Sequence, residues 1–425
     1  MANYSNISNA SNAAVVDKLR QIKNSGELSR GSFIASSNPF RVVQAQHNQC
    51  TEQNIAEYIA ASCLTHLYDG WNYLSTAMRA FVRNDVGVCG HAGYYAELRA
   101  ALSLLSVNGV VICRSEGLYL KSDLTIETLY AGDPTHVAVW EALKAYAQLP
   151  ATTSDKVQVD STIKVEGVSI EDWIVQLSGV GCSRTTFNSL LLECGADLER
   201  YSKDKDGRNK YSYSPTALEQ YRIFSGEDIR GKIKTFWELF EPLATGNLDK
   251  FDMYILQSVF CKHRDKMGWS ISEYESNVKS VINRLGLGHN VDLIFEKLCR
   301  ERYELPFRLD EDGGADGACL HVGMLIRACF MLRLATAACR DLLLSAGVSS
   351  QDLDVWLMHC QKDRFMWQAP VPNYRYEDLW VDVDDSLTSL NTYAPRDNET
   401  WLETEARSLE ILSRTEYIML WGLGL

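Results

Sequence analysis

The sequence predicts a mainly α-helical protein, made of multi-helix bundle domains with one or two small β-hairpins. Three observations predict this class. Apolar residues recur at helical spacing along most of the 425 residues. The composition, 46% hydrophobic and 23% charged, is that of a folded globular chain rather than a disordered one. Patterns typical of β-hairpins occur only in two short stretches, so we expect no large sheet.

The N-terminal region divides into a Ser/Asn-rich tail over residues 1–12, predicted to be disordered, and a helical domain over 13–150. The tail lacks a basic segment followed by an apolar one, so it does not have the pattern of a secretory signal. Thr51 precedes a run of apolar residues at helical spacing. This predicts an N-cap at Thr51 and a helix that extends to about Val82, with a weak point at Gly70.

Three further patterns complete this domain. Residues 94–105 repeat apolar side chains at helical spacing. Residues 110–113 and 118–120 are short apolar runs on either side of turn residues, which predicts a β-hairpin. A last helix is predicted to start at Asp133-Pro134, with the proline in its first turn, where helices tolerate this residue.

Residues 151–224 are predicted to form a middle module. We expect short helices over 170–177 and 185–194, then a second hairpin within 198–214. Helix, turn, helix and basic hairpin is the order of a winged helix. The alternative is a solvated loop joined to ordinary helices. The winged-helix interpretation brings five basic side chains to nucleic acid: Arg184, Lys203, Lys205, Arg208 and Lys210.

Residues 225–425 are predicted to form an acidic C-terminal helical domain. Of the formal charge of −13, residues 301–425 account for −10, which argues against a nucleic-acid surface in that part. The long apolar stretch over 318–346 contains several charged side chains. It therefore predicts a buried core helix rather than a membrane span.

The segment Gly90-His-Ala-Gly-Tyr-Tyr-Ala-Glu-Leu-Arg-Ala-Ala-Leu-Ser-Leu-Leu105 resembles a stretch of uncharacterised, mostly helical bacterial proteins found beside phage-defence and mobile-element genes. The resemblance covers residues 90–113 and implies no catalytic assignment. Four polar side chains interrupt its run of Ala and Leu, which predicts a buried structural network at a helix interface, with an active site as the alternative. They are Tyr94, Tyr95, Glu97 and Arg99.

Arg333 and Arg340 belong to the long apolar helix. They are seven residues apart and therefore share one stripe of that helix. Buried arginines need acidic partners, which we expect from the Asp-rich C-terminal third. The alternative is that the stripe binds an anion or an RNA phosphate.

Sequence patterns of common catalytic sites are absent: the phosphate-binding loop, the dinucleotide fingerprint, the nucleophile elbow and the His-Glu-x-x-His zinc motif. The Asp-rich loops at 204–207 and 310–316 lack the glutamate that completes a calcium loop. The 12 cysteines include no Cys-x-x-Cys pair, and we expect them to be reduced. We therefore expect no metal site and no cofactor.

Arginine followed by histidine at the spacing found in HEPN-type ribonucleases occurs twice. The matches are Arg41 with His47 and Arg284 with His289. Chance alone accounts for roughly this number of matches in a chain of this composition. The second match also spans an expected helix end, so the motif by itself does not indicate an RNA-cleaving site.

Two hypotheses of function follow. The leading one is a non-enzymatic cytosolic subunit of a bacterial multi-protein system, of the antiviral-defence kind. Such a subunit acts through a protein partner or a second copy of itself, with no membrane involved. The alternative is a nucleic-acid-dependent activity, either binding through residues 169–221 or HEPN-like cleavage of RNA.

Overall fold

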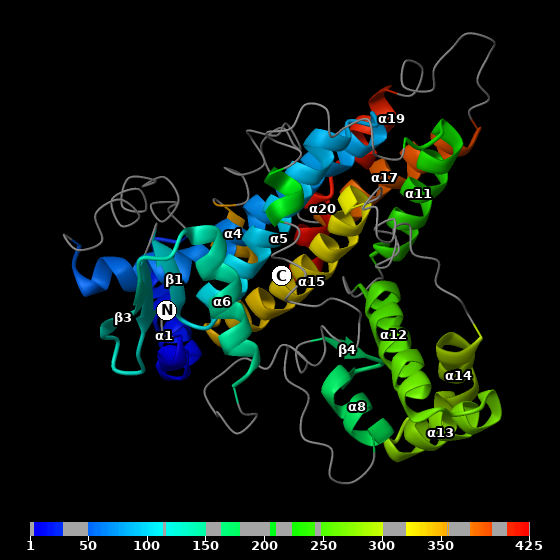
Figure 1. Ribbon diagram of the computed structural model, residues 1–425, viewed down its shortest axis with the longest axis horizontal. Helices are drawn as coiled ribbons and strands as arrows, with labels where there is room; N and C mark the ends of the chain where they lie inside the picture. The colour runs from blue at the N-terminus through cyan, green and yellow to red at the C-terminus, as the bar shows by residue number, and fades with distance from the viewer. Residues whose placement is uncertain are drawn as a thin grey trace.

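The structure is a computed structural model, and helices predominate in it (Figure 1). The strands form only a three-stranded and a two-stranded antiparallel sheet, so the mainly α class is confirmed. The described residues are 4–28, 50–113, 116–149, 163–178, 205–209, 223–242, 248–300, 320–354, 356, 375–392 and 406–424.

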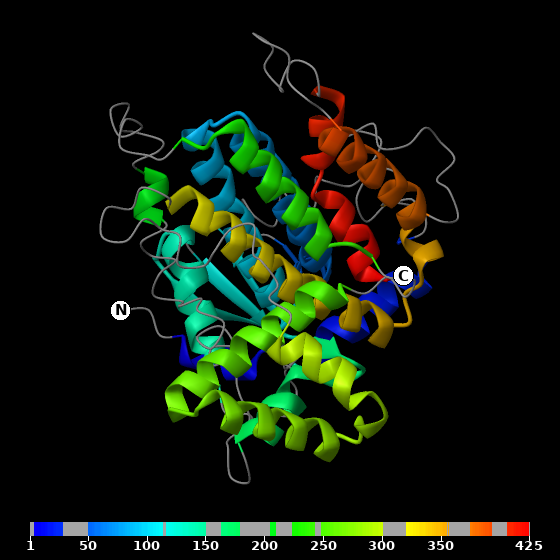
Figure 2. The same ribbon diagram turned by 90° about the vertical axis from the view of Figure 1, so that its right-hand side faces the viewer.

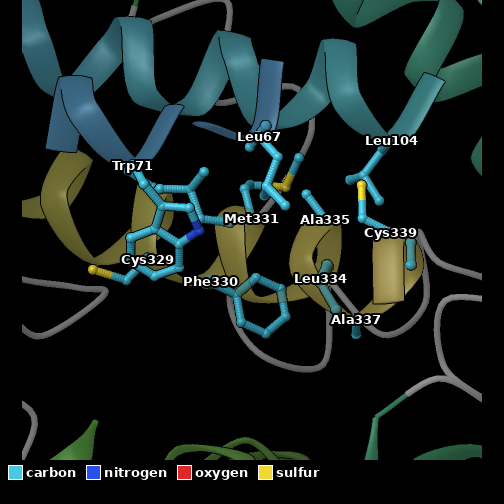
Figure 3. Close-up of a cluster of buried hydrophobic side chains, with 14 of the residues drawn as sticks. Leu67, Trp71, Leu104, Cys329, Phe330, Met331, Leu334, Ala335, Ala337 and Cys339 are labelled. Atoms are coloured by element: carbon cyan, nitrogen blue, oxygen red, sulfur yellow. The ribbon is translucent and has the colours of Figure 1, made fainter. Parts of the chain in front are cut away.

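The centre of the molecule is a bundle of three long helices: α4 (Glu52–Val82), α5 (Val86–Val107) and α15 (Leu320–Ser345). Thr51 caps α4 as predicted: its hydroxyl accepts from the Asn54 amide at 3.2 Å, and the Asn54 side chain accepts from the Thr51 amide at 3.3 Å. Side chains of all three helices meet in the core (Figure 3). There the Trp71 indole donates to the Thr336 hydroxyl at 3.1 Å.

Gly70 is not the weak point that the sequence predicted, because α4 continues through it without a break. A β-carbon at this position would lie 2.7 Å from Cδ2 of Leu332 and 3.3 Å from Cβ of Arg99. The missing side chain therefore allows α15 and α5 to approach α4 closely. Gly93 of α5 likewise allows α15 to come close. A β-carbon at Gly93 would lie 3.2 Å from the Cβ atom of Met324.

Helix α15 is long and apolar enough to cross a membrane, but its most hydrophobic window is completely buried inside the protein. Its cysteines contribute to this packing as small apolar side chains. Burial raises the pKa of Cys339 to about 12, so its thiol stays protonated. The position of α15 is that of a core helix.

A three-stranded sheet covers one end of the bundle, formed by β1 (Val110–Cys113), β2 (Glu116–Leu120) and β3 (Ile126–Ala131) in the order β1-β2-β3. The predicted hairpin is confirmed as β1 and β2, which pair antiparallel. Strand β3 was not predicted, because its sequence Ile-Glu-Thr-Leu-Tyr-Ala does not alternate strictly between apolar and polar residues. Helix α6 (Thr135–Ala147) follows Pro134, as predicted, and packs on α5 and β1.

The N-terminal segment differs from the predicted disordered tail from Tyr4 onward. Residues Ser5–Asn9 form a 3-10 helix (η1), and Ile7 is buried in the core. The Tyr4 hydroxyl donates to Asp133 at 2.9 Å, and the Ser11 amide donates to the Leu120 carbonyl at 2.8 Å. These two contacts and the burial of Ile7 outweigh the polar composition of the segment. Helix α1 (Asn12–Asn24) then packs on α4.

A second group of elements, called here the α12 lobe, lies beside the bundle (Figures 1 and 2). Trp173 of α8 packs edge-on against Phe260 of α12, with ring centroids 6.0 Å apart, and donates from its indole to the Val165 carbonyl at 3.2 Å. The lobe consists of β4 (Lys164–Val165), β5 (Val168–Ser169), α8 (Ile170–Ser178), α12 (Asp249–Met267), α13 (Ile271–Arg284), η4 (Gly288–Asn290) and α14 (Val291–Cys299).

The predicted winged-helix hairpin is wrong over 205–209, which form a helical turn. This turn packs Gly207 against α15, where a β-carbon would lie only 2.4 Å from Cδ2 of Leu320. Residues 205–209 are therefore a helical turn packed on α15, and not part of the exposed strand pair that the sequence predicted. The expected helix over 185–194 and the rest of the hairpin lie outside the described residues.

Four helices complete the far end of the bundle. Helix α11 begins after a capping box formed by Ser225 and Asp228. Helix α20 packs on α15 and α4, and its Trp421 lies 6.1 Å from Trp237 of α11, measured between ring centroids. The four are α11 (Gly226–Leu239), α17 (Arg375–Thr392), α19 (Ala406–Leu412) and α20 (Glu416–Leu423).

Candidate anion-binding site

The first half of α5 presents one face made of ring side chains. Asp85 caps this helix by accepting from the Val88 amide at 3.1 Å. His91, Tyr94 and Tyr95 follow at spacings of three and four residues, which places them on one side of the helix. Tyr94 is buried, whereas His91 and Tyr95 are half-buried.

Three other elements add side chains to this face. Tyr73 of α4 stacks on Tyr95, with ring centroids 5.3 Å apart and an interplanar angle of 24°. His136, in the first turn of α6, is hydrogen-bonded through Nδ1 to the Tyr94 hydroxyl at 3.2 Å. The helical turn 205–209 supplies the cations. We call this group the Arg208 cluster; its members are Tyr73, His91, Tyr94, Tyr95, His136, Lys205 and Arg208.

Arg208 lies over the two adjacent tyrosines of α5. Its guanidinium carbon is 5.4 Å from the ring centroid of Tyr94 and 5.8 Å from that of Tyr95. Arg208 is only 8% exposed, and its buried Nε has no hydrogen-bond partner. In the part of the chain that the structure describes, no carboxylate pairs with Arg208 or with Lys205. Such an arrangement is unusual, because buried charges are normally paired.

Three titratable members of the Arg208 cluster, His91, Tyr94 and His136, are neutral at pH 7. Burial, followed by the charge of Arg208, lowers the pKa of His91. The same two causes lower the pKa of His136, with Lys205 adding to the effect. Burial raises the pKa of Tyr94 to about 12, so its phenol keeps its proton. The cluster therefore has positive charge from Lys205 and Arg208 and no compensating carboxylate among its members.

This arrangement suits an anion. Guanidinium and ammonium groups donate charge-assisted hydrogen bonds, and imidazole and phenol groups add neutral donors at the edge of the same cluster. It does not suit a cation, and no group of three metal-ligating side chains occurs within the described ranges. Phosphate and carboxylate are the anions that arginine binds best.

The structure separates the four polar residues of α5 that were predicted to share one network. Tyr94 and Tyr95 belong to the Arg208 cluster. Glu97 is fully buried and pairs with Arg327 of α15, at 3.4 Å between Oε1 and Nε. Arg99 donates to Nδ1 of His66 at 2.9 Å and lies 3.5 Å from the Asp69 carboxylate.

Arg333 and Arg340 of α15 have different surroundings. Arg333 makes a bidentate ion pair with Asp252, at 2.7 and 2.6 Å. This partner belongs to α12 and not to the C-terminal third, which corrects the sequence-based expectation. The reason is spatial: α12 places a buried carboxylate beside α15. Arg340 lies at the end of α20, where a β-carbon on Gly424 would be 3.1 Å from its guanidinium carbon.

Of the five basic residues predicted to contact nucleic acid, Lys205 and Arg208 lie in the Arg208 cluster. Arg208 is buried on α5 instead of exposed at a hairpin tip, because the turn that carries it packs on the bundle. The other three lie outside the described residues: Arg184, Lys203 and Lys210.

The two HEPN-type matches do not contribute to the cluster. Arg284 donates to the Gln176 carbonyl of α8 at 2.5 Å, and His289 is exposed in η4. Arg41 and His47 lie outside the described residues.

Sequence reasoning missed Tyr73, His91 and His136. The spacing of His91 and Tyr95 by four residues was the only local signal for the first histidine. Tyr73 and His136 are 22 and 41 residues from Tyr95 along the chain, and only tertiary packing brings them together. Comparisons with protein-family models, curated proteins and solved structures found no match to this chain.

Proposed function

We propose that this protein binds a phosphate-bearing ligand at the Arg208 cluster. The observation that carries the proposal is the buried Arg208 side chain, which lacks a carboxylate partner within the described residues. Two tyrosine rings lie against its guanidinium. A cation–π contact is worth roughly 0.5–2 kcal/mol, and burial of an unpaired charge costs more than this. An anion that bonds to Arg208 offsets the remaining cost.

Lys205 and the two histidines support the same proposal. Lys205 is half-buried one helical turn away from Arg208 and influences the pKa of His136. A dianionic phosphate placed among these groups stabilises the protonated form of each imidazole. Protonation of the histidines in turn strengthens the binding of the phosphate. This proposal retains two residues of the nucleic-acid hypothesis, Lys205 and Arg208, in a different structural setting.

The test is titration calorimetry of the full chain with pyrophosphate, using wild type and Arg208→Gln. We expect Arg208→Gln to weaken binding by about 10- to 100-fold, because charge-assisted hydrogen bonds contribute roughly 1.5–3 kcal/mol. Circular dichroism and the thermal midpoint establish that the variant is folded.

The matched control is Arg264→Gln. Arg264 also lies over a tyrosine, 5.6 Å from the ring centroid of Tyr274, but its guanidinium is paired with Asp265 at 2.7 Å. We expect this change to leave pyrophosphate binding unaltered. Equal binding by wild type and Arg208→Gln, or no binding of pyrophosphate by wild type, contradicts the proposal.

A second candidate function is the non-enzymatic cytosolic subunit of a bacterial defence-type system. One observation favours it: Met267 and Ile271, at the corner between α12 and α13, are 54% and 72% exposed beside the half-buried Trp269. Exposed apolar side chains grouped in this way are typical of protein contacts. Purification from the native host with and without nuclease tests this candidate. A stoichiometric protein that survives nuclease supports it, and recovery of the chain alone contradicts it.

A further inference from the structure

We infer that the ligand of the Arg208 cluster is a small nucleotide, with its base stacked on the tyrosines and its phosphate bound by Arg208 and Lys205. This inference rests on the proposed anion site and adds the chemical class of the ligand.

The rings form a continuous aromatic surface centred on Tyr95. Tyr73 stacks on Tyr95 at 5.3 Å, and His91 lies 4.9 Å from it on the same helix face, measured between ring centroids. All three side chains are half-buried, so part of each remains accessible to solvent. Inorganic phosphate makes no use of such a surface, whereas a nucleobase stacks on it.

The position of Tyr95 links this surface to the cation. The Tyr95 ring centroid is 5.8 Å from the guanidinium carbon of Arg208 and 5.3 Å from the ring centroid of Tyr73. The rings that stack on the base and the Arg208 guanidinium that binds the phosphate therefore lie within one ring of each other. One nucleotide, which carries its base and its phosphate on the same sugar, covers this separation.

The charge of the protein favours a mononucleotide over a nucleic-acid strand. The cluster contains two cations without a carboxylate partner among the described residues, Lys205 and Arg208. Two cations are enough to bind one phosphate or one diphosphate. The formal charge of the chain, −13, also repels a polyanion.

The experiment compares three probes in the full chain by titration calorimetry: AMP, ribose 5-phosphate and an oligonucleotide of eight thymidylates. We expect AMP to bind about tenfold more tightly than ribose 5-phosphate, because only AMP has a base to stack. Tyr95→Leu and Tyr73→Leu should abolish this difference between the two compounds, because each variant removes a ring from the stacking surface. Tyr95→Phe keeps the ring and should therefore keep the difference in affinity between AMP and ribose 5-phosphate.

Tyr68→Leu is the matched control. Tyr68 is also a half-buried tyrosine of α4, but its ring contacts Trp356, with centroids 6.0 Å apart, and not the Arg208 cluster. We expect this variant to bind AMP as wild type does.

The outcomes separate this inference from the proposed function. Equal affinities for AMP and ribose 5-phosphate overturn the nucleotide inference and leave the anion site intact. No binding of either compound, or of pyrophosphate, overturns both. An oligonucleotide that binds at least tenfold more tightly than AMP, with a steep salt dependence, replaces the nucleotide with a nucleic-acid strand.

Discussion

At the scale of single residues, the interior holds several charged side chains, and most are paired. Glu97 pairs with Arg327, and Lys18 of α1, almost fully buried, lies 3.4 Å from the Glu57 carboxylate. These pairs satisfy the requirement that a buried charge meet an opposite one. Arg208 is the exception, because it is buried and no carboxylate among the described residues pairs with it. The proposed anion site is therefore placed at this side chain.

His66 provides a residue-scale prediction on pH. It is buried in α4, and its Nδ1 accepts from Arg99, since arginine can only donate. Burial, with a contribution from the charge of Arg99, lowers the pKa of His66 to about 3. The unfolded chain, in which histidine titrates near 6.5, therefore binds this proton first as the pH falls. The folded state is destabilised progressively from about pH 6.5 downward.

We expect His66→Asn to reduce this sensitivity, because its amide oxygen replaces the Nδ1 acceptor and does not titrate. Between pH 7 and pH 5, the free energy of unfolding of wild type should fall by about 2 kcal/mol more than that of the variant. Urea unfolding at the two pH values measures the difference. His289→Asn, at an exposed position in η4, should behave as wild type. Parallel losses in wild type and His66→Asn would show that the folded state does not hold the pKa of His66 below that of an unfolded histidine.

At the scale of elements, α4, α5 and α15 pack closely because glycines lie at their contacts. The hydrophobic periodicity of α4, together with the capping residue Thr51, was enough to predict its start and end. The role of Gly70 was not predictable, because a glycine inside a helix weakens that helix in isolation. Its benefit appears only when Leu332 of α15 occupies the space beside it.

Gly70→Val tests this packing. We expect a loss of about 1–3 kcal/mol in the free energy of unfolding, because the added isopropyl group competes with Leu332 for the same space. Gly231→Val is the control, since Gly231 lies in α11 with no atom within 4 Å of an added β-carbon. That change should be neutral or slightly stabilising, as valine is a better helix former than glycine. Chemical denaturation of both variants provides the comparison, and equal effects contradict the packing argument.

At the scale of the whole molecule, the bundle and the α12 lobe are joined by a buried ion pair. Asp252 of α12 and Arg333 of α15 are both nearly inaccessible to solvent, and two hydrogen bonds connect them. Removal of one partner leaves the other charge buried alone, which is far more costly than loss of a surface pair.

We therefore expect Asp252→Asn to lower the free energy of unfolding by about 3–5 kcal/mol. Glu296→Gln breaks an exposed pair with Arg300 and should cost at most about 1 kcal/mol. The double variant Asp252→Leu with Arg333→Met should recover much of the loss, because it leaves no unpaired charge. Urea unfolding measures all three. A double variant as unstable as Asp252→Asn would argue against the unpaired charge as the cause.

The sequence by itself determined the helical class, the N-cap and bounds of α4, the position of α6 and the β1–β2 hairpin. Each depends on periodicity, capping and turn residues within a few positions of one another. Tertiary structure alone decided that Arg333 pairs with Asp252, that residues 205–209 form a buried turn, and that four separate segments assemble the Arg208 cluster. These contacts join residues tens to hundreds of positions apart, and burial in a shared core, which local sequence does not encode, selects them.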